Sequence, residues 1–358
     1  RGREVVGRGG GGTREAGMTD IFAAVEAARQ EDNGSNAGSD DTELLIVGSK
    51  QAGKSTIINS FLGKDEVPKP TAALEYRFAR RSAGSHNATA VANLWELGGG
   101  TQLAELLKVV LVPDRLSRSM VAITLDMSSP NDALSTLLFW LQAIRQHIDK
   151  ATTQLKAFAS GEEERRALEQ KTTEVWRTHE DNGKVRPIGV TILIIAHKWD
   201  EFEAAFPESD YRKLACKALR YYAHMNGASL VCSQHKDKQM MASLRNMLFQ
   251  HAFAAAPLRT SQLEYNKPIV APVGFDTLAG IGNPPSIQGS SSDRPEEAWK
   301  VAFEVTFPPA KESVQGADLS AVDSEQFAED LIDELRRQKR AEVDKLRREA
   351  QLEEQLKR

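Results

Sequence analysis

The residues of this chain best suited to chemistry lie together in the stretch VGSKQAGKST, at positions 47–56. Two glycines, a lysine and a serine follow the spacing G-x-x-x-x-G-K-[ST] there, which is typical of a loop that binds the phosphates of a nucleotide. The residues that we expect to contact a nucleotide through this loop are Gly48, Ser49, Lys50, Gln51, Ala52, Gly53, Lys54, Ser55 and Thr56.

Each residue type has a chemical role in such a loop. Glycines let successive backbone N–H groups turn toward the phosphates, and a helix that starts after Gly53 adds the positive end of its dipole. Lys54 is placed to reach the β- and γ-phosphates, and Ser55 is placed to ligate Mg²⁺. The expected cofactor is GTP or GDP with Mg²⁺. An empty loop and a chance glycine-rich turn are the alternatives.

The motifs that accompany this loop in a GTP-hydrolysing domain are only partly present. Thr71 is the candidate switch threonine and a second candidate ligand for the metal. The stretch LWELGGG at 94–100 has Glu96 where an aspartate is usual, and we expect the longer side chain to alter support of the Mg²⁺. Gly100 stands where a water-orienting glutamine is needed. Because phosphoryl transfer depends on positioning, this predicts poor hydrolysis.

A base-reading motif of the form [NT]-K-x-D is represented by AHKWD at 196–200. Asp200 could accept hydrogen bonds from guanine, and Lys198 could lie beneath the base, but His197 replaces the usual asparagine. We favour His197 as a strand-end histidine satisfied by the backbone over a base contact, and Ser233 could also stand near the base. Guanine selectivity stays an open expectation.

The elements that must position these residues alternate along the chain. Apolar runs predict strands at 43–47, 90–97, 120–126, 190–197 and 229–233, and helical spacing is found at 54–62, 133–158, 211–225 and 240–255. Such alternation requires crossover connections. It predicts an α/β fold, a mostly parallel sheet with helices on both faces.

The chain divides into four expected parts. Residues 1–41 are glycine-rich and polar with one short helical stretch, and Met18 is the expected biological start. Residues 42–256 form the phosphate-loop domain, and 257–320 read as an irregular segment that wraps the domain or binds a partner. Residues 321–358 predict a charged helix, which is either solvated, part of a coiled coil or docked on a partner.

Composition excludes several classes of function. A formal charge of −4 leaves no basic surplus for a nucleic acid partner. No apolar run approaches the roughly 18 residues that span a bilayer, so membrane insertion is not expected. Cys216 and Cys232 lack metal-binding spacing and are expected to be buried thiols, and the histidines lack such spacing too. The charged stretch 161–171 predicts a solvated insert helix.

The stretches VGSKQAGKST, KPTAALEYRFARR, NLWELGGG, DMSSPND and YYAHMNGASLVCS together resemble the cytoplasmic dynein light intermediate chains, and most of all the dynein-2 type. The resemblance runs from about residue 42 to near Pro309. It implies a Ras-like G domain in a subunit that is not itself a motor. Gly48, Gly53, Lys54, Ser55 and Thr56 match the phosphate loop of that family, Glu96 with Gly98, Gly99 and Gly100 match its ELGGG, and Lys198 with Asp200 match its K-x-D.

The function implied by the resemblance is a non-catalytic one. Such a subunit binds and stabilises the dynein-2 heavy chain for retrograde intraflagellar transport, and meets other dynein-2 subunits and transport particles indirectly. Its expected locations are the cytoplasm, the cilium or flagellum, the basal body and the cytoskeleton. Slow GTP hydrolysis is compatible with it. An active GTPase switch is the alternative, and a P-loop kinase or ATPase is the third reading.

Overall fold

The computed structural model describes residues 41–83, 88–156, 161–255, 260–286 and 294–309, and helical residues at 334, 335, 337–343 and 345. The residues described at the C-terminal end fall within the stretch expected to form a charged helix, which stays a prediction. The predicted N-terminal segment with its short helix, and the rest of the C-terminal helix, lie outside the described residues.

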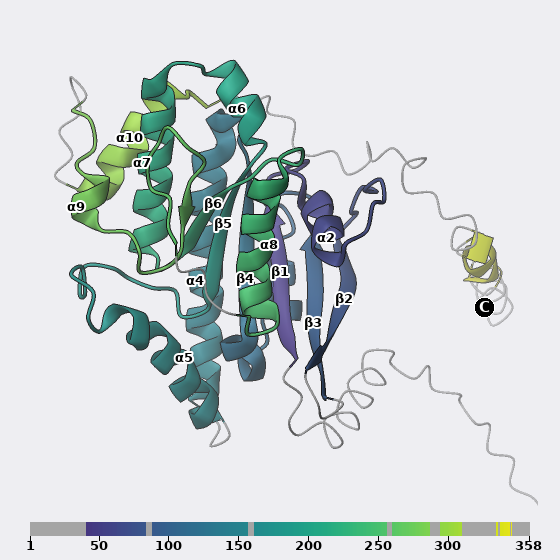
Figure 1. Cartoon of the computed structure of the whole chain (residues 1–358). Helices are drawn as coiled ribbons and strands as arrows, with labels where there is room; N and C mark the ends of the chain where they lie inside the picture. Colours follow the sequence, from purple (N-terminus) through teal and green to yellow (C-terminus); the bar gives the residue numbers. More distant parts are fainter. Residues whose placement is uncertain are drawn as a thin grey trace, which may run out of the picture. The chain divides into compact units, whose positions relative to one another are not determined.

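A seven-stranded sheet forms the centre of the domain, in the order β2-β3-β1-β4-β5-β6-β7 (Figure 1). The central strands from β3 to β6 are parallel to their neighbours, whereas β2 is antiparallel to β3 and β7 is antiparallel to β6. The predicted mostly parallel α/β fold is confirmed. The strands are β1 Thr42–Gly48, β2 Leu74–Ala83, β3 Ala88–Leu97, β4 Ser119–Asp126, β5 Thr191–His197, β6 Ser229–Cys232 and β7 Val270–Ala271.

Helices cover both faces of the sheet, because the central strands are apolar on both sides. From β1, Leu44 and Ile46 face a core formed with α2 and α8, while Leu45 and Val47 face a second core formed with α4 and α7. The longer helices are α2 Lys54–Leu62, α4 Ala133–Leu155, α5 Gly161–Trp176, α7 Ser209–Met225, α8 Lys238–Ala252 and α10 Pro295–Thr306, and the shorter ones are α3 Leu107–Val110, α6 Trp199–Ala205 and α9 Leu278–Ile281.

Two strands were not predicted, and both lie at an end of the sheet. The sequence of β2, LEYRFARRSA, carries charged residues on both of its faces. An edge strand tolerates such residues, and among the described strands only β3 pairs with β2. The short β7 pairs with β6 through only Val270 and Ala271. Neither has the apolar run by which the central strands are recognised.

The segment after residue 256 contributes to the core. Besides β7, helix α10 packs on α7, and Trp299, Phe303 and Phe307 are buried in the same apolar cluster as the central strands. A buried ion pair fastens this segment to α7: Arg220 binds Asp276 through two hydrogen bonds of 2.6 and 2.7 Å. The hydrophobic core therefore extends past the boundary expected at residue 256.

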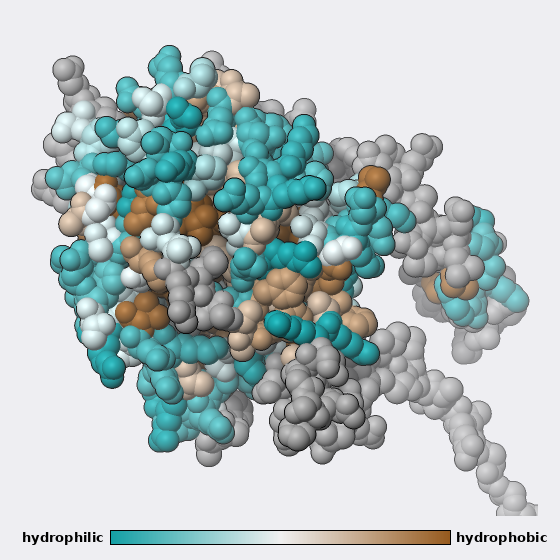
Figure 2. All heavy atoms as spheres, in the orientation of Figure 1, coloured by the Kyte–Doolittle hydropathy of each residue, from teal (hydrophilic) through white to brown (hydrophobic). Residues whose placement is uncertain are grey.

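Helix α5 was predicted as a solvated insert, and it is only partly so. Leu168 and Trp176 are buried, and Glu164 accepts a hydrogen bond of 2.8 Å from the Ser117 hydroxyl. Both cysteines are buried and unpaired, as expected. No helix among the described residues combines the length and the apolar character needed to cross a bilayer. On the face shown in Figure 2, hydrophilic residues cover most of the described surface and hydrophobic ones form small patches.

Candidate nucleotide site

The phosphate loop connects β1 to α2, as the sequence predicted, and its shape depends on glycine at two positions. Gly48 has φ +133°, and a Cβ atom there would lie 1.9 Å from the carbonyl oxygen of Thr124 on β4. Gly53 has φ +84°, and a Cβ atom there would lie 2.6 Å from the His197 ring. The loop lies so close to β4 and to the end of β5 that neither position has room for a side chain, and glycine is required at both.

The start of α2 is built to receive an anion. Its first turn contains no acidic residue, and no side chain caps it. The first hydrogen bond of the helix is donated by the Ile57 N–H to the Gly53 carbonyl, so the N–H groups of the first helical residues, 54–56, have no acceptor within the helix. These amides and the helix dipole favour a phosphate group at this point.

Lys54 is the buried cation of the site, only 6% exposed. Its Nζ donates a hydrogen bond of 2.8 Å to the carbonyl oxygen of Ser49, which keeps the ammonium within the loop. Burial lowers the pKa of Lys54, and the nearby Glu96 carboxylate opposes this effect. An anionic phosphate would supply the counter-charge that this buried amine lacks.

Ser55 and Glu96 meet directly. The Ser55 hydroxyl donates a hydrogen bond of 2.7 Å to Oε1 of Glu96, at the end of β3. In the described part of the chain, the other carboxylate oxygen, Oε2, is buried without a hydrogen-bond partner. Burial raises the pKa of Glu96, and Ser55, Lys54 and the nearby Thr71 side chain partly offset this effect. The longer side chain therefore still reaches the serine that an aspartate would support.

These residues fit a magnesium ion. A serine hydroxyl beside a buried carboxylate with an unpaired oxygen is the hard oxygen donor set that Mg²⁺ prefers, and this ion keeps several of its waters when bound. Ser55 would be the ligand, and Oε2 of Glu96 would accept from the waters. The ion would offset charge on the phosphates beside Lys54.

Thr71 lies near this group, and its side chain is one of the influences that lower the pKa of the Glu96 carboxyl. Its Oγ1 donates a hydrogen bond of 3.2 Å to Glu75, and its carbonyl oxygen lies 2.2 Å from where a Cβ atom of Gly98 would be. The Gly98 N–H donates a hydrogen bond of 2.7 Å to the Ala73 carbonyl. The segment 71–73 thus packs on the ELGGG motif through its backbone, and its role as a metal ligand stays a prediction.

The missing glutamine at Gly100 is not explained by lack of space. A Cβ atom there would be 3.7 Å from the backbone nitrogen of Lys50, which is an ordinary contact, although φ is +63°. A side chain at this position would face the phosphate loop. The site therefore has room for a Cβ atom at this position, and the chain carries none there.

His197 links the phosphate loop to the end of β6. Its Nδ1 is 2.8 Å from the Ser233 hydroxyl, and its ring lies against Gly53. Burial, and then the charge of Lys198, lower the pKa of His197 to about 4, so the ring is neutral near pH 7. We expected a backbone partner for this ring, and the partner is instead a side-chain hydroxyl.

Lys198 and Asp200 lie where β5 passes into α6. Lys198 has φ +60°, and its Nζ donates a hydrogen bond of 2.6 Å to Asp126 at the end of β4. In the described part of the chain, no hydrogen bond or ion pair engages the Asp200 carboxylate, which leaves it able to accept from a base. Asp126 was not singled out from the sequence. Its place beside the site follows from the parallel register of β4 and β5, which puts Asp126 next to His197.

A second polar group was not foreseen from the spacing of the histidines. Ligand atoms of His179, Asp181 and His224 lie within 4.8 Å of one another. The group is satisfied internally: the two ring nitrogens of His179 bind the Asp276 carbonyl and the Asp181 N–H, and Asp181 also binds His224. Its role is to hold the loop after α5 against α7.

The fold and the phosphate loop define a P-loop domain of the Ras-like type. The family model described as dynein light intermediate chain (DLIC) matches residues 30–187. A crystal structure of the dynein light intermediate chain's conserved domain superimposes with a TM-score of 0.51 at 16% identity, covering 76% of this chain and 94% of that one. This likeness establishes the fold.

Similarity in sequence establishes the family. Cytoplasmic dynein 2 light intermediate chain 1 of Homo sapiens is 34% identical over 338 residues, covering 91% of this chain and 94% of the human protein. The protein of that name from Rattus norvegicus is 34% identical over 316 residues, covering 86% and 88%. Cytoplasmic dynein 1 light intermediate chain 1 of Homo sapiens is 23% identical over 312 residues, covering 79% of this chain and only 58% of that protein. The chain belongs to the dynein light intermediate chain family, and the human and rat relatives at 34% identity are of the dynein-2 type.

Proposed function

We propose that this chain is a non-catalytic subunit of a cytoplasmic dynein-2 motor that binds and stabilises the heavy chain for retrograde intraflagellar transport. The observation that carries this proposal is similarity over 94% of a dynein-2 light intermediate chain, well beyond the phosphate loop. Other dynein-2 subunits and transport particles are reached through the heavy chain. The proposed locations are the cytoplasm, the cilium with its basal body, and the cytoskeleton.

The phosphate loop is proposed to hold GDP or GTP with Mg²⁺ without rapid hydrolysis. Supporting this are the amides at the start of α2, the buried Lys54 and the Ser55–Glu96 pair, which together form a complete cradle. The absence of a side chain at Gly100 argues against fast turnover. A bound nucleotide would then act as part of the folded core, because a ligand that binds only the folded state stabilises it.

The test is recovery of the heavy chain from ciliated cells by the tagged full chain, with GTP turnover measured on the same preparation. We expect the heavy chain to be recovered, and turnover to be no faster than in Lys54→Ala. Failure to recover the heavy chain would contradict the subunit role. Rapid turnover that disappears in Lys54→Ala would instead favour a GTPase switch.

A further inference from the structure

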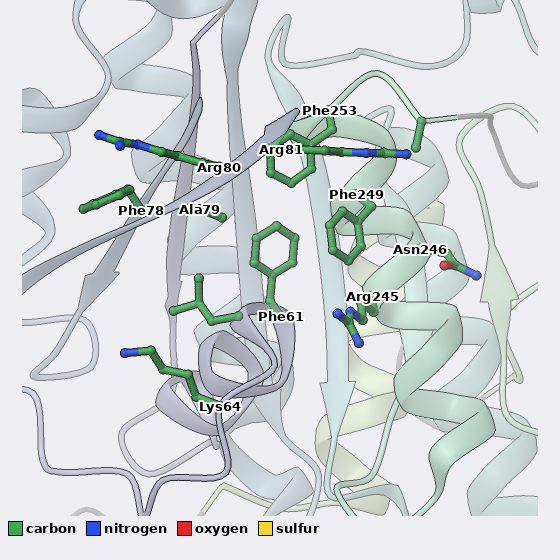
Figure 3. A pocket seen from close by; sticks show the side chains of 12 residues that line it. Phe61, Lys64, Phe78, Ala79, Arg80, Arg81, Arg245, Asn246, Phe249 and Phe253 are labelled. Atoms are coloured by element: carbon green, nitrogen blue, oxygen red, sulfur yellow. The ribbon is translucent and has the colours of Figure 1, made fainter. Parts of the chain in front are cut away.

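A groove with an unusual lining lies at the other end of α2 from the phosphate loop. It has a volume of about 780 Å³ and lies between the end of α2, the second half of α8 and the stretch 78–81 of β2 (Figure 3). Aromatic and cationic side chains dominate its lining, and none of its lining residues is acidic. A protein with 50 acidic and 46 basic residues does not produce this by average composition.

The floor of the groove is aromatic. Phe61 from α2 stacks on Phe249 from α8 with ring centroids 4.7 Å apart, and Phe253 lies 6.2 Å from Phe61 and 5.5 Å from Phe249. Figure 3 shows these three rings between α2, α8 and β2. Phe249 and Phe253 are only half-buried, so the floor is open to an apolar side chain from outside.

Four cations line the groove: Lys64, Arg80, Arg81 and Arg245. Arg81 and Arg245 lie beside the three rings, whereas Arg80 and Phe78 point to the other face of β2 (Figure 3). Lys64 forms an ion pair with Glu66. The Arg80 guanidinium lies 5.0 Å from the centre of the Phe78 ring, and that of Arg245 lies 5.2 Å from the centre of the Phe249 ring. Within the described residues, none of the three arginines forms an ion pair with a carboxylate. Their hydrogen-bond donors are therefore available, and the guanidinium shape matches a carboxylate.

The position of β2 favours a polypeptide as the ligand. This strand is at the edge of the sheet, and β3 pairs with one side of it only, so its other side offers backbone donors and acceptors. The net charge of −4 opposes binding of the whole protein to an anionic membrane or a nucleic acid. A short acidic peptide would meet the local cations and little of that repulsion.

We propose that this groove docks an acidic segment of the dynein heavy chain that carries an aromatic or branched aliphatic anchor. The anchor packs on Phe61, Phe249 and Phe253, and its flanking carboxylates pair with Arg81 and Arg245. This inference rests on the proposed function for the identity of the partner. The chemistry of the ligand follows from the lining alone: aromatic and arginine side chains are the ones that carry most binding energy at protein interfaces.

The test uses the full chain with two double variants of equal charge change. Arg81→Glu with Arg245→Glu reverses two exposed cations of the groove, and Lys150→Glu with Arg177→Glu reverses two exposed cations elsewhere. Two ligands are measured against each protein: the heavy-chain tail, and a labelled synthetic peptide in which glutamates flank a Phe-Leu pair. A peptide with glutamines in place of the glutamates is the matched probe.

We expect the groove variant to bind the tail and the acidic peptide at least about tenfold more weakly, while the control variant binds both like the wild type. The glutamine peptide should bind weakly to all three proteins. Peptide binding that is absent, or equal in both variants, overturns the docking site. Tail binding that survives the groove variant while peptide binding is lost overturns the heavy chain as the partner. A wild type that binds the peptide but no tail refutes the proposed function, and with it this partner.

Tighter binding of phosphatidylserine vesicles or of an oligothymidine than of the acidic peptide would also overturn the proposal, because it would make the groove a site for those anions. A third variant, Phe78→Ala, leaves the charge unchanged. The Phe78 ring is 48% exposed and lies with Arg80 on the face of β2 away from the three phenylalanines, so the tail and the peptide should bind this variant like the wild type. A loss as large as that of the groove variant would overturn the proposed position of the anchor.

Discussion

The Ser55 hydroxyl donates a hydrogen bond to the Glu96 carboxylate, which joins the phosphate loop to the end of β3 across 41 positions of sequence. Glu96 is only 3% exposed, and its second oxygen has no hydrogen-bond partner among the residues that the structure describes. The contact holds in place the serine that is proposed to bind Mg²⁺. It also places a poorly compensated carboxylate in the core, which has measurable consequences.

The first prediction concerns the pH dependence of stability. Burial raises the pKa of Glu96 above its ordinary value of 4.5, so the folded protein retains this proton to higher pH than the unfolded chain does. Its contribution to the free energy of unfolding therefore falls as pH rises from 4.5 through the raised pKa. Glu96→Gln should remove this decline, and should be more stable than the wild type at pH 7 without nucleotide. Urea unfolding across this range checks it, and parallel curves for the two proteins would contradict it.

The second prediction concerns His197, whose pKa of about 4 lies below the ordinary 6.5 because of burial. The unfolded chain takes up this proton first, so stability is lost as pH falls from 6.5 through 4, by at most about 3 kcal/mol. His197→Asn keeps a neutral side chain for Ser233 and should lose less. Burial lowers the pKa of His251 to about 4 as well, so this histidine adds the same acid sensitivity to both proteins. The contribution of His197 is therefore the difference between the variant and the wild type. Equal acid sensitivity of both proteins would show that His197 does not titrate in this way.

Gly53→Ala should abolish nucleotide retention. Its Cβ atom would lie 2.6 Å from the His197 ring in addition to the strain of φ +84°. Gly63→Ala is the matched control: φ is +67° there, but nothing lies within 4 Å, so only the backbone strain of about 1 kcal/mol applies. Thermal unfolding and mass analysis of bound nucleotide measure both effects. Similar losses in the two variants would mean that the contact with His197 is unimportant.

Gly100→Gln should increase GTP hydrolysis by at least about tenfold, because an amide there can orient water beside the phosphate loop. Gly100→Ala carries the same backbone strain without the amide and should hydrolyse GTP like the wild type. Single-turnover hydrolysis at saturating Mg²⁺ distinguishes them. An unchanged rate in Gly100→Gln would show that more than this side chain is missing.

Asp276→Ala should destabilise the domain by about 3 to 5 kcal/mol, because it leaves the Arg220 guanidinium buried without its partner. Replacing both residues by apolar ones, Arg220→Met with Asp276→Leu, should cost less than the single change. Unfolding in guanidinium chloride, monitored by tryptophan fluorescence, measures the difference in the free energy of unfolding. A double variant at least as unstable as the single one would contradict the expected cost of an unpaired charge.

The sequence predicted what depends on local spacing. The helix at 54–62 was predicted with the bounds that the structure shows, because the glycine motif and the apolar period are both local signals. The pairing of Lys198 with Asp126 could not be predicted in this way, since it depends on the register of β4 and β5. The strand β2 was missed because an edge strand tolerates charged residues, which hide the alternating pattern. The aromatic groove beside it could not be predicted either, because its lining comes from three elements far apart in sequence.

The most direct measurement of the subunit role is retention of the heavy-chain tail on the immobilised full chain during washes with GTP, with GDP and without nucleotide. A non-catalytic subunit predicts that the tail binds and stays bound to the same extent in all three washes. A tail that does not bind, or that is released only as GTP is hydrolysed, would contradict it.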